Sequence, residues 1–300
     1  MYRDFFEMVG QAGISLHGAE VFHNGEIVLK RSFDGDIAHP IYSATKSVTA
    51  AAVLMAAGEG KLSVKDKLYY YMDSKYLSDM PDGFRQLSFT DCMTMCAAPY
   101  PFRPQNAAEQ TESGRKDDWL YSIFRLDTDY SDRRFHYSNI PAYLVSAACE
   151  NAVGQSLADW LRPRLFEPLG WGSPIYQLSP EGHFYGATGM YLTVSQLARL
   201  GQLFLQKGEF MGTQLIRRDL AEAAVTRHVF LQDGEGYGWF FWVSDNTFDI
   251  SGKWGQRCVA NPKTGLMVTY LSDNPDRSGE LADIARRFVA SAEQEHKRNF

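Results

Sequence analysis

An apolar, alanine-rich run from Val48 to Ala57 follows directly on the tetrapeptide Ser43-Ala44-Thr45-Lys46. Alanine and unbranched apolar residues favour helix, so the run predicts a helix that begins close to this tetrapeptide. Residues three apart lie on one face of a helix, so Lys46 would hold its ammonium beside the Ser43 hydroxyl. A serine hydroxyl becomes a good nucleophile when a neighbour takes its proton or stabilises the alkoxide. The pair is therefore a candidate nucleophile with its activating group, although Ser-x-x-Lys also occurs by chance in many proteins.

The bulk composition excludes several classes of protein. The chain has 300 residues, which suits one large domain or two interleaved lobes. Its formal net charge of −6, without a stripe of basic residues, disfavours a nucleic-acid partner and leaves a small-molecule substrate as the expected one. No stretch of about 18 apolar residues is present, so no membrane span is expected. The oligomeric state is not readable from the sequence.

The first residues lack the pattern of a secretory signal, which needs a basic start and then an apolar stretch. Asp4 and Glu7 interrupt this region. We therefore expect a cytoplasmic protein, with a trimmed export signal as the alternative.

The four cysteines form no Cys-x-x-Cys pair, and the seven histidines form no His-Glu-x-x-His pattern. We therefore expect free thiols, no metal site and no cofactor. The cysteines are Cys92, Cys96, Cys149 and Cys258.

Strand patterns occur near both ends of the chain and helical patterns in the middle. Asn24-Gly25 separates two alternating segments, which is a strong hairpin signal because both turn positions need positive φ. The polar, proline-bearing stretch from Pro99 to Gly114 predicts a long loop. The order of patterns favours an α+β fold, an antiparallel sheet flanked by helices with an inserted all-helical lobe. We predict one lobe from residues 1–64 and 185–300, a helical lobe from 65–184, and an active site between them.

A second candidate motif, Tyr137-Ser138-Asn139, lies at the start of a predicted helix. A nearby lysine ammonium favours the phenolate of a tyrosine, which could then act as a general base. The Asn139 amide could hydrogen-bond a substrate carbonyl or hold the lysine. Taken alone, the motif also fits a buried tyrosine and a helix cap.

A third candidate motif, Lys253-Trp254-Gly255-Gln256, follows Gly252 and opens a late strand. Glycine lets the backbone approach a ligand closely, and the edge of a strand offers N–H groups for an oxyanion hole. Taken alone, this is also an ordinary glycine-bearing turn.

The order and spacing of Tyr42 to Lys46, Tyr137-Ser138-Asn139 and Lys253-Trp254-Gly255 resemble those of the serine β-lactamase and penicillin-binding-protein-like superfamily. The resemblance is nearest to its class C-like branch, which includes esterases, D-aminopeptidases and oligoamide hydrolases. It extends from about Glu20 to Ala290 and implies a β-lactamase/DD-peptidase-like fold.

The resemblance also implies roles for the motif residues. Ser43 would be the acylated nucleophile, and Lys46 would shuttle its proton and keep Tyr137 acidic. Tyr137 would be the base and would then activate the deacylating water. Asn139 would orient the substrate, and the backbone N–H groups of Ser43 and Gln256 would form the oxyanion hole. Whether Lys46 or Tyr137 is the base for acylation stays open.

Lys263-Thr264-Gly265 spells the third motif of the superfamily literally, but it follows Asn261-Pro262 in a predicted turn. Eight residues of extended strand, from 255 to 263, span roughly 26 Å, so both candidates cannot line one site. We therefore expect Lys253, and not Lys263, beside Ser43.

The expected function is hydrolysis of esters or small amides through an acyl-enzyme. Trp254 stands where β-lactamases have a hydroxyl residue that helps to bind a carboxylate, and its mainly apolar indole weakens recognition of a carboxylate-bearing β-lactam. Arg257 could compensate, but strand alternation should turn it to the face opposite to Gln256. The alternatives are a β-lactamase or a peptidase acting on D-amino-acid peptides, and a ligand-binding member of the fold without catalysis. Aromatic residues that could line the site are Tyr100, Phe102, Trp119, Trp239 and Trp242.

Overall fold

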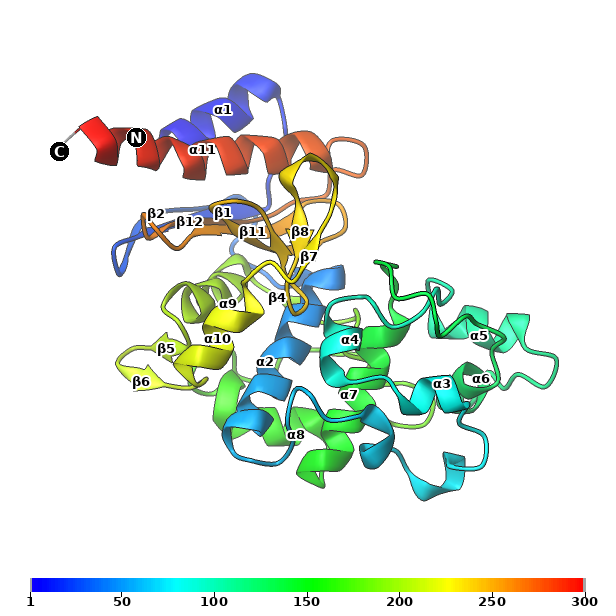
Figure 1. The fold of residues 1–300 in the computed structure, drawn as a ribbon. Coiled ribbons are helices and arrows are strands. Elements are labelled where there is room, and N and C mark those ends of the chain that lie inside the picture. The colour runs from blue at the N-terminus through cyan, green and yellow to red at the C-terminus, as the bar shows by residue number, and fades with distance from the viewer. Residues whose placement is uncertain (1, 299–300) are drawn as a thin grey trace.

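The protein is built around one antiparallel sheet of eight strands, ordered β2-β1-β12-β11-β10-β9-β8-β7 (Figure 1). The computed structural model describes residues 2–298, and its side chains except those of residues 233 and 292–298. The strands come from both ends of the chain, as expected. They are β1 (Gly18–His23), β2 (Glu26–Ser32), β7 (Val229–Phe230), β8 (Gly236–Tyr237), β9 (Trp242–Val243), β10 (Phe248–Gly252), β11 (Gln256–Asn261) and β12 (Leu266–Leu271).

The predicted hairpin at Asn24-Gly25 is confirmed. β1 and β2 pair across it, and both turn residues have positive φ, 51° for Asn24 and 90° for Gly25. Two short ladders lie outside the sheet. They are β3 (His39–Pro40) with β4 (Tyr191–Leu192), and β5 (Glu209–Phe210) with β6 (Thr213–Gln214).

Helices cover both faces of the sheet (Figure 1). The terminal helices α1 (Asp4–Ala12) and α11 (Ser278–Arg298) pack on one face, where Phe5 and Phe288 join an apolar cluster with strand residues such as Val268. On the other face α9 (Val194–Leu205) contacts β1, β11 and β12, and α10 (Arg218–Ala224) follows it in the chain.

The middle of the chain is helical. It contains the α-helices α3 (Asp82–Arg85), α4 (Phe89–Met93), α5 (Pro104–Gln110), α6 (Trp119–Phe124), α7 (Ile140–Val153) and α8 (Leu157–Leu161), the 3-10 turns η2 (Leu68–Tyr71) and η3 (Ser74–Tyr76), and the π-helical turn η4 (Arg162–Phe166). The fold therefore confirms the predicted antiparallel sheet with flanking helices. The division at residues 64/65 and 184/185 stays a prediction.

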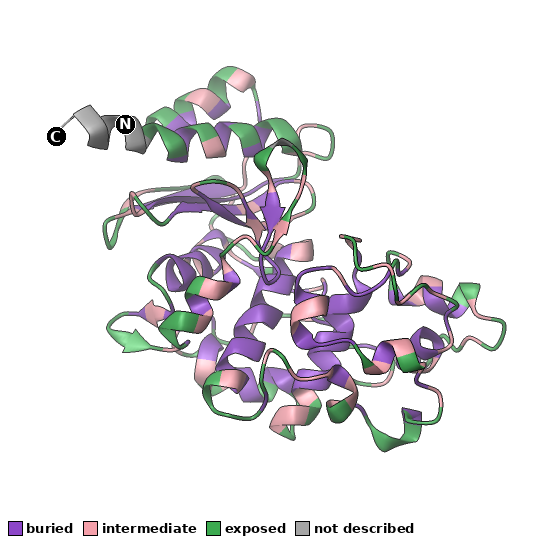
Figure 2. Ribbon diagram, viewed as in Figure 1, coloured by how far each residue is buried: buried purple, intermediate pink, exposed green. Residues whose placement is uncertain are grey.

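The predicted helix behind Ser43 is confirmed as α2 (Thr45–Gly58). It runs through the centre of the molecule against α7, and every residue from Thr45 to Ala56 is buried (Figure 2). Because apolar and small residues occupy all sides of this helix, it has no solvent face. It therefore gives Lys46 a rigid, buried position.

The prediction of a loop from Pro99 to Gly114 is wrong in part, because α5 forms within it. Pro104 occupies the first turn of α5, where a missing N–H costs nothing. In the aromatic stretch from Tyr237 to Val243, Phe240 adopts a φ of 63° and separates β8 from β9.

The four cysteines are free thiols, as expected. Within residues 2–298, no helix combines the length and apolar character needed to span a membrane.

Strand β10 passes so close to the segment before Ser43 that only glycine fits at its end. A Cβ atom on Gly252 would lie 2.1 Å from the carbonyl oxygen of Ile41. Backbone atoms on both sides leave little room for adjustment, so this contact fixes the distance between the sheet and the segment before Ser43.

We expect Gly252→Ala to lower the free energy of unfolding by about 1–3 kcal/mol, because overpacking forces backbone shifts. Gly10→Ala is the matched control, since nothing lies within 4 Å of a Cβ at that helical position. It should be neutral or stabilising by up to about 1 kcal/mol. Urea unfolding of both variants checks this, and equal stabilities would show that Gly252 is not tightly packed.

Candidate active site

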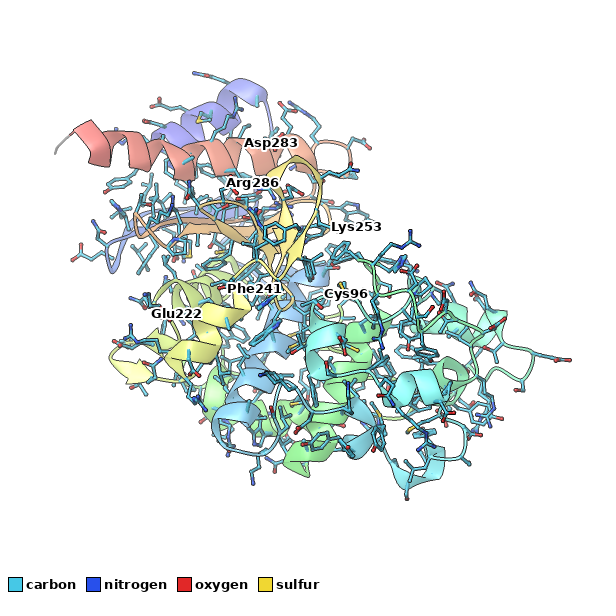
Figure 3. The ribbon with its side chains drawn as sticks, in the orientation of Figure 1. Cys96, Glu222, Phe241, Lys253, Asp283 and Arg286 are labelled. Carbon is cyan, nitrogen blue, oxygen red and sulfur yellow. The ribbon has the colours of Figure 1, made fainter. Side chains whose placement is uncertain are left out.

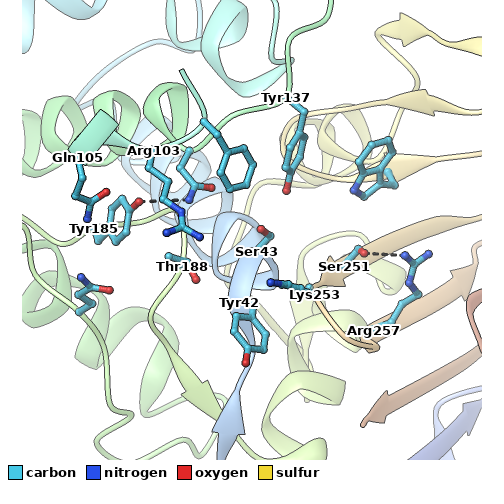
Figure 4. A pocket seen from close by; sticks show the side chains of 15 residues that line it. Tyr42, Ser43, Arg103, Gln105, Tyr137, Tyr185, Thr188, Ser251, Lys253 and Arg257 are labelled. Atoms are coloured by element: carbon cyan, nitrogen blue, oxygen red, sulfur yellow. Dashed lines mark hydrogen bonds between the residues drawn. The ribbon is translucent and has the colours of Figure 1, made fainter. Parts of the chain in front are cut away.

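Ser43 opens on a cleft of about 520 Å³. The walls come from several parts of the chain: the turn before α2, the segments around residues 102–105, 137–139 and 177–188, the start of β9, the end of β10 and the start of β11 (Figure 4). Ser43 lies in the 3-10 turn η1 (Tyr42–Ala44), immediately before α2. The first N–H groups of a helix have no partner within the helix, so the Ser43 N–H is available to a ligand.

The turn that presents Ser43 is strained. Tyr42 has a φ of 47°, in the left-handed region that side chains other than glycine rarely adopt. The Thr45 hydroxyl donates to the Tyr42 carbonyl at 2.7 Å and braces the turn. The ring of Trp254, a residue with a φ of 65°, packs edge-on against the Tyr42 ring at 5.1 Å between centroids. Such strain, of order 1–3 kcal/mol per residue, persists only where the surroundings enforce it.

Lys46 is buried, with 1 % of its surface exposed. Its ammonium donates to the Ser43 hydroxyl at 3.2 Å, the Asn139 side-chain carbonyl at 2.7 Å and the Ala187 backbone carbonyl at 3.0 Å. No carboxylate is among these partners, and burial lowers the pKa of Lys46 to about 7. A substantial fraction of Lys46 is therefore neutral at pH 7 and able to accept the Ser43 proton.

Tyr137 points its hydroxyl toward Ser43 (Figure 4). Its ring stacks on Trp242 at 5.6 Å between centroids, and the Lys46 Nζ lies 5.1 Å from the ring centroid. Burial raises the pKa of Tyr137, and hydrogen bonding to Ser43 opposes this rise. The phenol is therefore neutral at pH 7. This arrangement favours Tyr137 as a proton donor more than as the base expected from the sequence.

The Asn139 side chain binds Lys46. This is one of the two roles expected from the sequence, the other being a hydrogen bond to a substrate carbonyl. The Asn139 Oδ1 accepts from Lys46, and its Nδ2 donates to the Tyr185 hydroxyl at 3.3 Å. Sequence reasoning did not select Tyr185, which comes from a segment without a motif.

The third motif reaches the cleft through its first residue only. Ser251, Gly252 and Lys253 line the cleft, whereas Trp254, Gly255 and Gln256 do not. The Gln256 side chain instead pairs with the backbone of Ser272, accepting from its N–H at 3.3 Å. The structure therefore does not bring the Gln256 side chain to Ser43.

Strand alternation indicates which backbone groups face the cleft. The Ser244 N–H donates to the Thr247 carbonyl at 2.9 Å, so Thr247 directs its backbone polar groups toward β9. Every second residue of β10 does the same, which places the N–H group of Ser251 on that side, and Lys253 comes two residues later, directly after the last strand residue Gly252. β9 begins at Trp242 opposite Asp249, so the edge beyond Asp249 has no β9 partner.

Lys253 lies at the edge of the sheet that faces the helical part of the chain (Figure 3). Lys263 instead lies in the turn between β11 and β12, beside the Asn246 amide, and is not in the lining of the cleft. The structure thus places Lys253, and not Lys263, with Ser43.

Arg257 and Gln256 point to opposite sides, as strand alternation predicted, but Arg257 lines the cleft and Gln256 does not, which is the reverse of the expected assignment. The Arg257 guanidinium donates to Asp249 at 2.7 Å and to the Ser251 hydroxyl at 2.8 Å. Arg286 from α11, labelled in Figure 3, binds the same Asp249 oxygen at 3.0 Å. Asp249 therefore already neutralises much of the Arg257 charge.

The aromatic residues proposed from the sequence divide into two groups. Phe102 and Trp242 line the cleft, together with Tyr42 and Tyr185. The others are buried in the core and do not line it, namely Tyr100, Trp119 and Trp239.

One cluster of side chains of the types that bind metal ions was not identified from the sequence, because its three residues come from separate segments. His17, Asp34 and His39 hold their ligand atoms within 4.8 Å of one another. The same Asp34 oxygen lies 3.1 Å from His17 Nδ1 and 2.6 Å from His39 Nε2, so the three side chains satisfy one another. None of them lines the cleft that contains Ser43.

Comparisons with solved structures reveal the same fold in several hydrolases and penicillin-binding proteins. A Bacillus anthracis protein assigned as a 6-aminohexanoate-dimer hydrolase has 20 % identity and a TM-score of 0.75, over 97 % of this chain and 82 % of that one. EstCE1, a hydrolase with promiscuous acyltransferase activity, has 15 % identity and a TM-score of 0.74, over 96 % and 98 %. A penicillin-binding protein from Bacillus halodurans has 14 % identity and a TM-score of 0.70, over 95 % and 99 %.

No curated protein matches the sequence significantly. The family model described as Beta-lactamase matches residues 5–292, which is nearly the whole chain. This match agrees with the order of the three motifs and with the fold. The chain belongs to the Beta-lactamase family.

Proposed function

We propose that the protein is a serine hydrolase that cleaves esters or small amides through an acyl-enzyme on Ser43. The observation that carries the proposal is the buried Lys46 ammonium, 3.2 Å from the Ser43 hydroxyl, with its pKa lowered to about 7. Burying a lysine without a carboxylate partner is costly, and such groups concentrate at functional sites. Membership of the Beta-lactamase family supports the same conclusion.

The proposed acylation begins with neutral Lys46 taking the Ser43 proton while Oγ attacks the substrate carbonyl carbon. The N–H groups of Ser43 and Lys253 stabilise the oxyanion, and Lys253 here takes the role that the sequence suggested for Gln256. The tetrahedral intermediate then collapses, the bond to the leaving atom breaks, and that atom takes a proton from Tyr137. Lys46 returns its proton to Tyr137, and water later hydrolyses the Ser43 ester.

Esters and small amides remain the favoured substrates, for a reason different from the one read in the sequence. Trp254 packs on Tyr42 and does not line the cleft, so its apolar side chain is no argument against a substrate that carries a carboxylate. The aromatic rings that do line the cleft, Phe102, Trp242 and Tyr185, offer apolar contact to an acyl chain or an aromatic alcohol.

A β-lactam or a D-amino-acid peptide is the second candidate substrate. The Ser251 hydroxyl stands at the edge of β10 next to Lys253, and a hydroxyl beside a cation can bind a carboxylate. Arg257, which already binds Asp249 and Ser251, is less available for this task. We therefore rank this candidate below esters and amides.

We expect a fluorophosphonate probe to label the wild-type protein and not Ser43→Ala. Turnover of short-chain p-nitrophenyl esters should fall by at least about 10³-fold in this variant, because nucleophilic catalysis is lost. Mass spectrometry of the labelled protein and initial rates measure the two effects. Nitrocefin should be hydrolysed more slowly than the esters.

Ser63→Ala is the matched control, since Ser63 is exposed and lies outside the cleft. It should keep both labelling and turnover. Absence of labelling in the wild type would favour a ligand-binding protein without catalysis, and faster turnover of nitrocefin than of esters would favour a β-lactamase.

The pH dependence of acylation should identify the base. If neutral Lys46 takes the proton, kcat/KM rises with pH through about 7 and is level above about pH 8, since the deprotonated form is active. If Tyr137 phenolate were the base, its raised pKa would make kcat/KM climb beyond pH 10. A pH–rate profile with a stable amide or ester distinguishes the two, and a rise that continues above pH 9 would contradict Lys46 as the base.

A further inference from the structure

The cleft has an unusual balance of charge. Its lining includes Arg103, Lys253 and Arg257 and no aspartate or glutamate, although the whole chain carries a net charge of −6. A cleft of one charge sign raises the local concentration of ligands with the opposite sign. The cleft is therefore suited to an anionic substrate.

The three cationic side chains differ in how many interactions they already make with other residues. Arg257 is bound by Asp249, and the Lys253 ammonium lies over the Trp254 ring at 4.5 Å from its centroid. The Arg103 guanidinium is exposed and, within the described part of the chain, makes no hydrogen bond or ion pair through its side chain. It is thus the cation most available to a ligand.

The position of Arg103 next to the catalytic groups is fixed by the backbone. The Asn139 N–H donates to the Phe102 carbonyl at 2.8 Å, and Pro104 begins α5 directly after Arg103. In Figure 4 the guanidinium lies beside Tyr185 and on the side of Ser43 opposite to Lys253. Gln105 also lines this wall, and its buried side-chain oxygen has no hydrogen-bond partner.

The proposed mechanism determines which part of a substrate meets Arg103, so this step depends on the proposed function. The tetrahedral carbon bonded to Ser43 has three other substituents. The oxyanion faces the Lys253 N–H, and the leaving atom faces the Tyr137 hydroxyl that protonates it. The third substituent, the acyl chain, then points toward the wall formed by Arg103 and Gln105.

We infer that Arg103 binds a carboxylate at the far end of the acyl group, so that the preferred substrates are monoesters or monoamides of dicarboxylic acids. A guanidinium donates two parallel hydrogen bonds to a carboxylate, which fixes both its position and its orientation. The Gln105 amide can add a further donor after rotation, and Phe102 covers the apolar part of the chain.

The test compares mono-p-nitrophenyl esters of glutaric, adipic and suberic acid with the same esters methylated at the free carboxylate, after subtraction of the uncatalysed rates. We expect wild-type kcat/KM to favour the free acid by roughly tenfold at one chain length, as suits a charge-assisted contact at an exposed site. Arg103→Gln should remove most of this preference, and Arg103→Lys should keep part of it. The preference should also weaken with added salt.

Arg115→Gln is the matched control, because Arg115 is exposed, pairs with Asp117 and lies outside the cleft. It should retain the wild-type preference. Equal turnover of free and methylated esters by the wild type, or an unchanged preference in Arg103→Gln, would overturn the inference alone. If neither ester were hydrolysed faster than by Ser43→Ala, the proposed function would fail and the inference with it.

Discussion

The burial of one ammonium group without an anionic partner is the constraint on which the site depends. Lys46 has three acceptors, and they come from the turn before α2, the start of α7 and the segment at Ala187. The structure must hold all three at once, since an unsatisfied buried cation would cost far more than any single hydrogen bond. Burial of the same group lowers the pKa of Lys46, because desolvation disfavours its charged form.

The sheet contributes a rigid wall rather than a reactive side chain. Gly252 approaches the Ile41 carbonyl too closely for any side chain, and Trp254 supports the strained Tyr42 from the other side of the turn. These contacts fix the Ser43 N–H relative to the edge of β10. An oxyanion hole depends on such fixed donors, because its benefit comes from groups that need no rearrangement during the reaction.

Much of this arrangement was predictable from the sequence, because it follows from local patterns. Asn24-Gly25 specified a hairpin, and the apolar run after Lys46 specified a central helix. The choice of Lys253 over Lys263 followed from the turn composition around Lys263, from the resemblance of the Lys253 motif, and from the reach of a strand, which excluded both together. The proposed replacement of the Gln256 N–H by the Lys253 N–H was not predictable in the same way, because it depends on the reversal at Trp254 and Gly255, both with positive φ.

Features that depend on packing between distant segments were not visible in the sequence. Tyr185 and Arg103 belong to no motif, and they reach the cleft only because their segments are tied to Asn139. The proposed exchange of roles, with Lys46 as the base and Tyr137 as the proton donor, has the same origin. A lysine next to a tyrosine suggests a phenolate, but burial disfavours the charged form of both groups, so that at pH 7 the phenol is neutral and a substantial fraction of the amine is neutral. In the proposed mechanism, desolvation therefore decides the direction of proton transfer, and desolvation is a property of the fold and not of the motif.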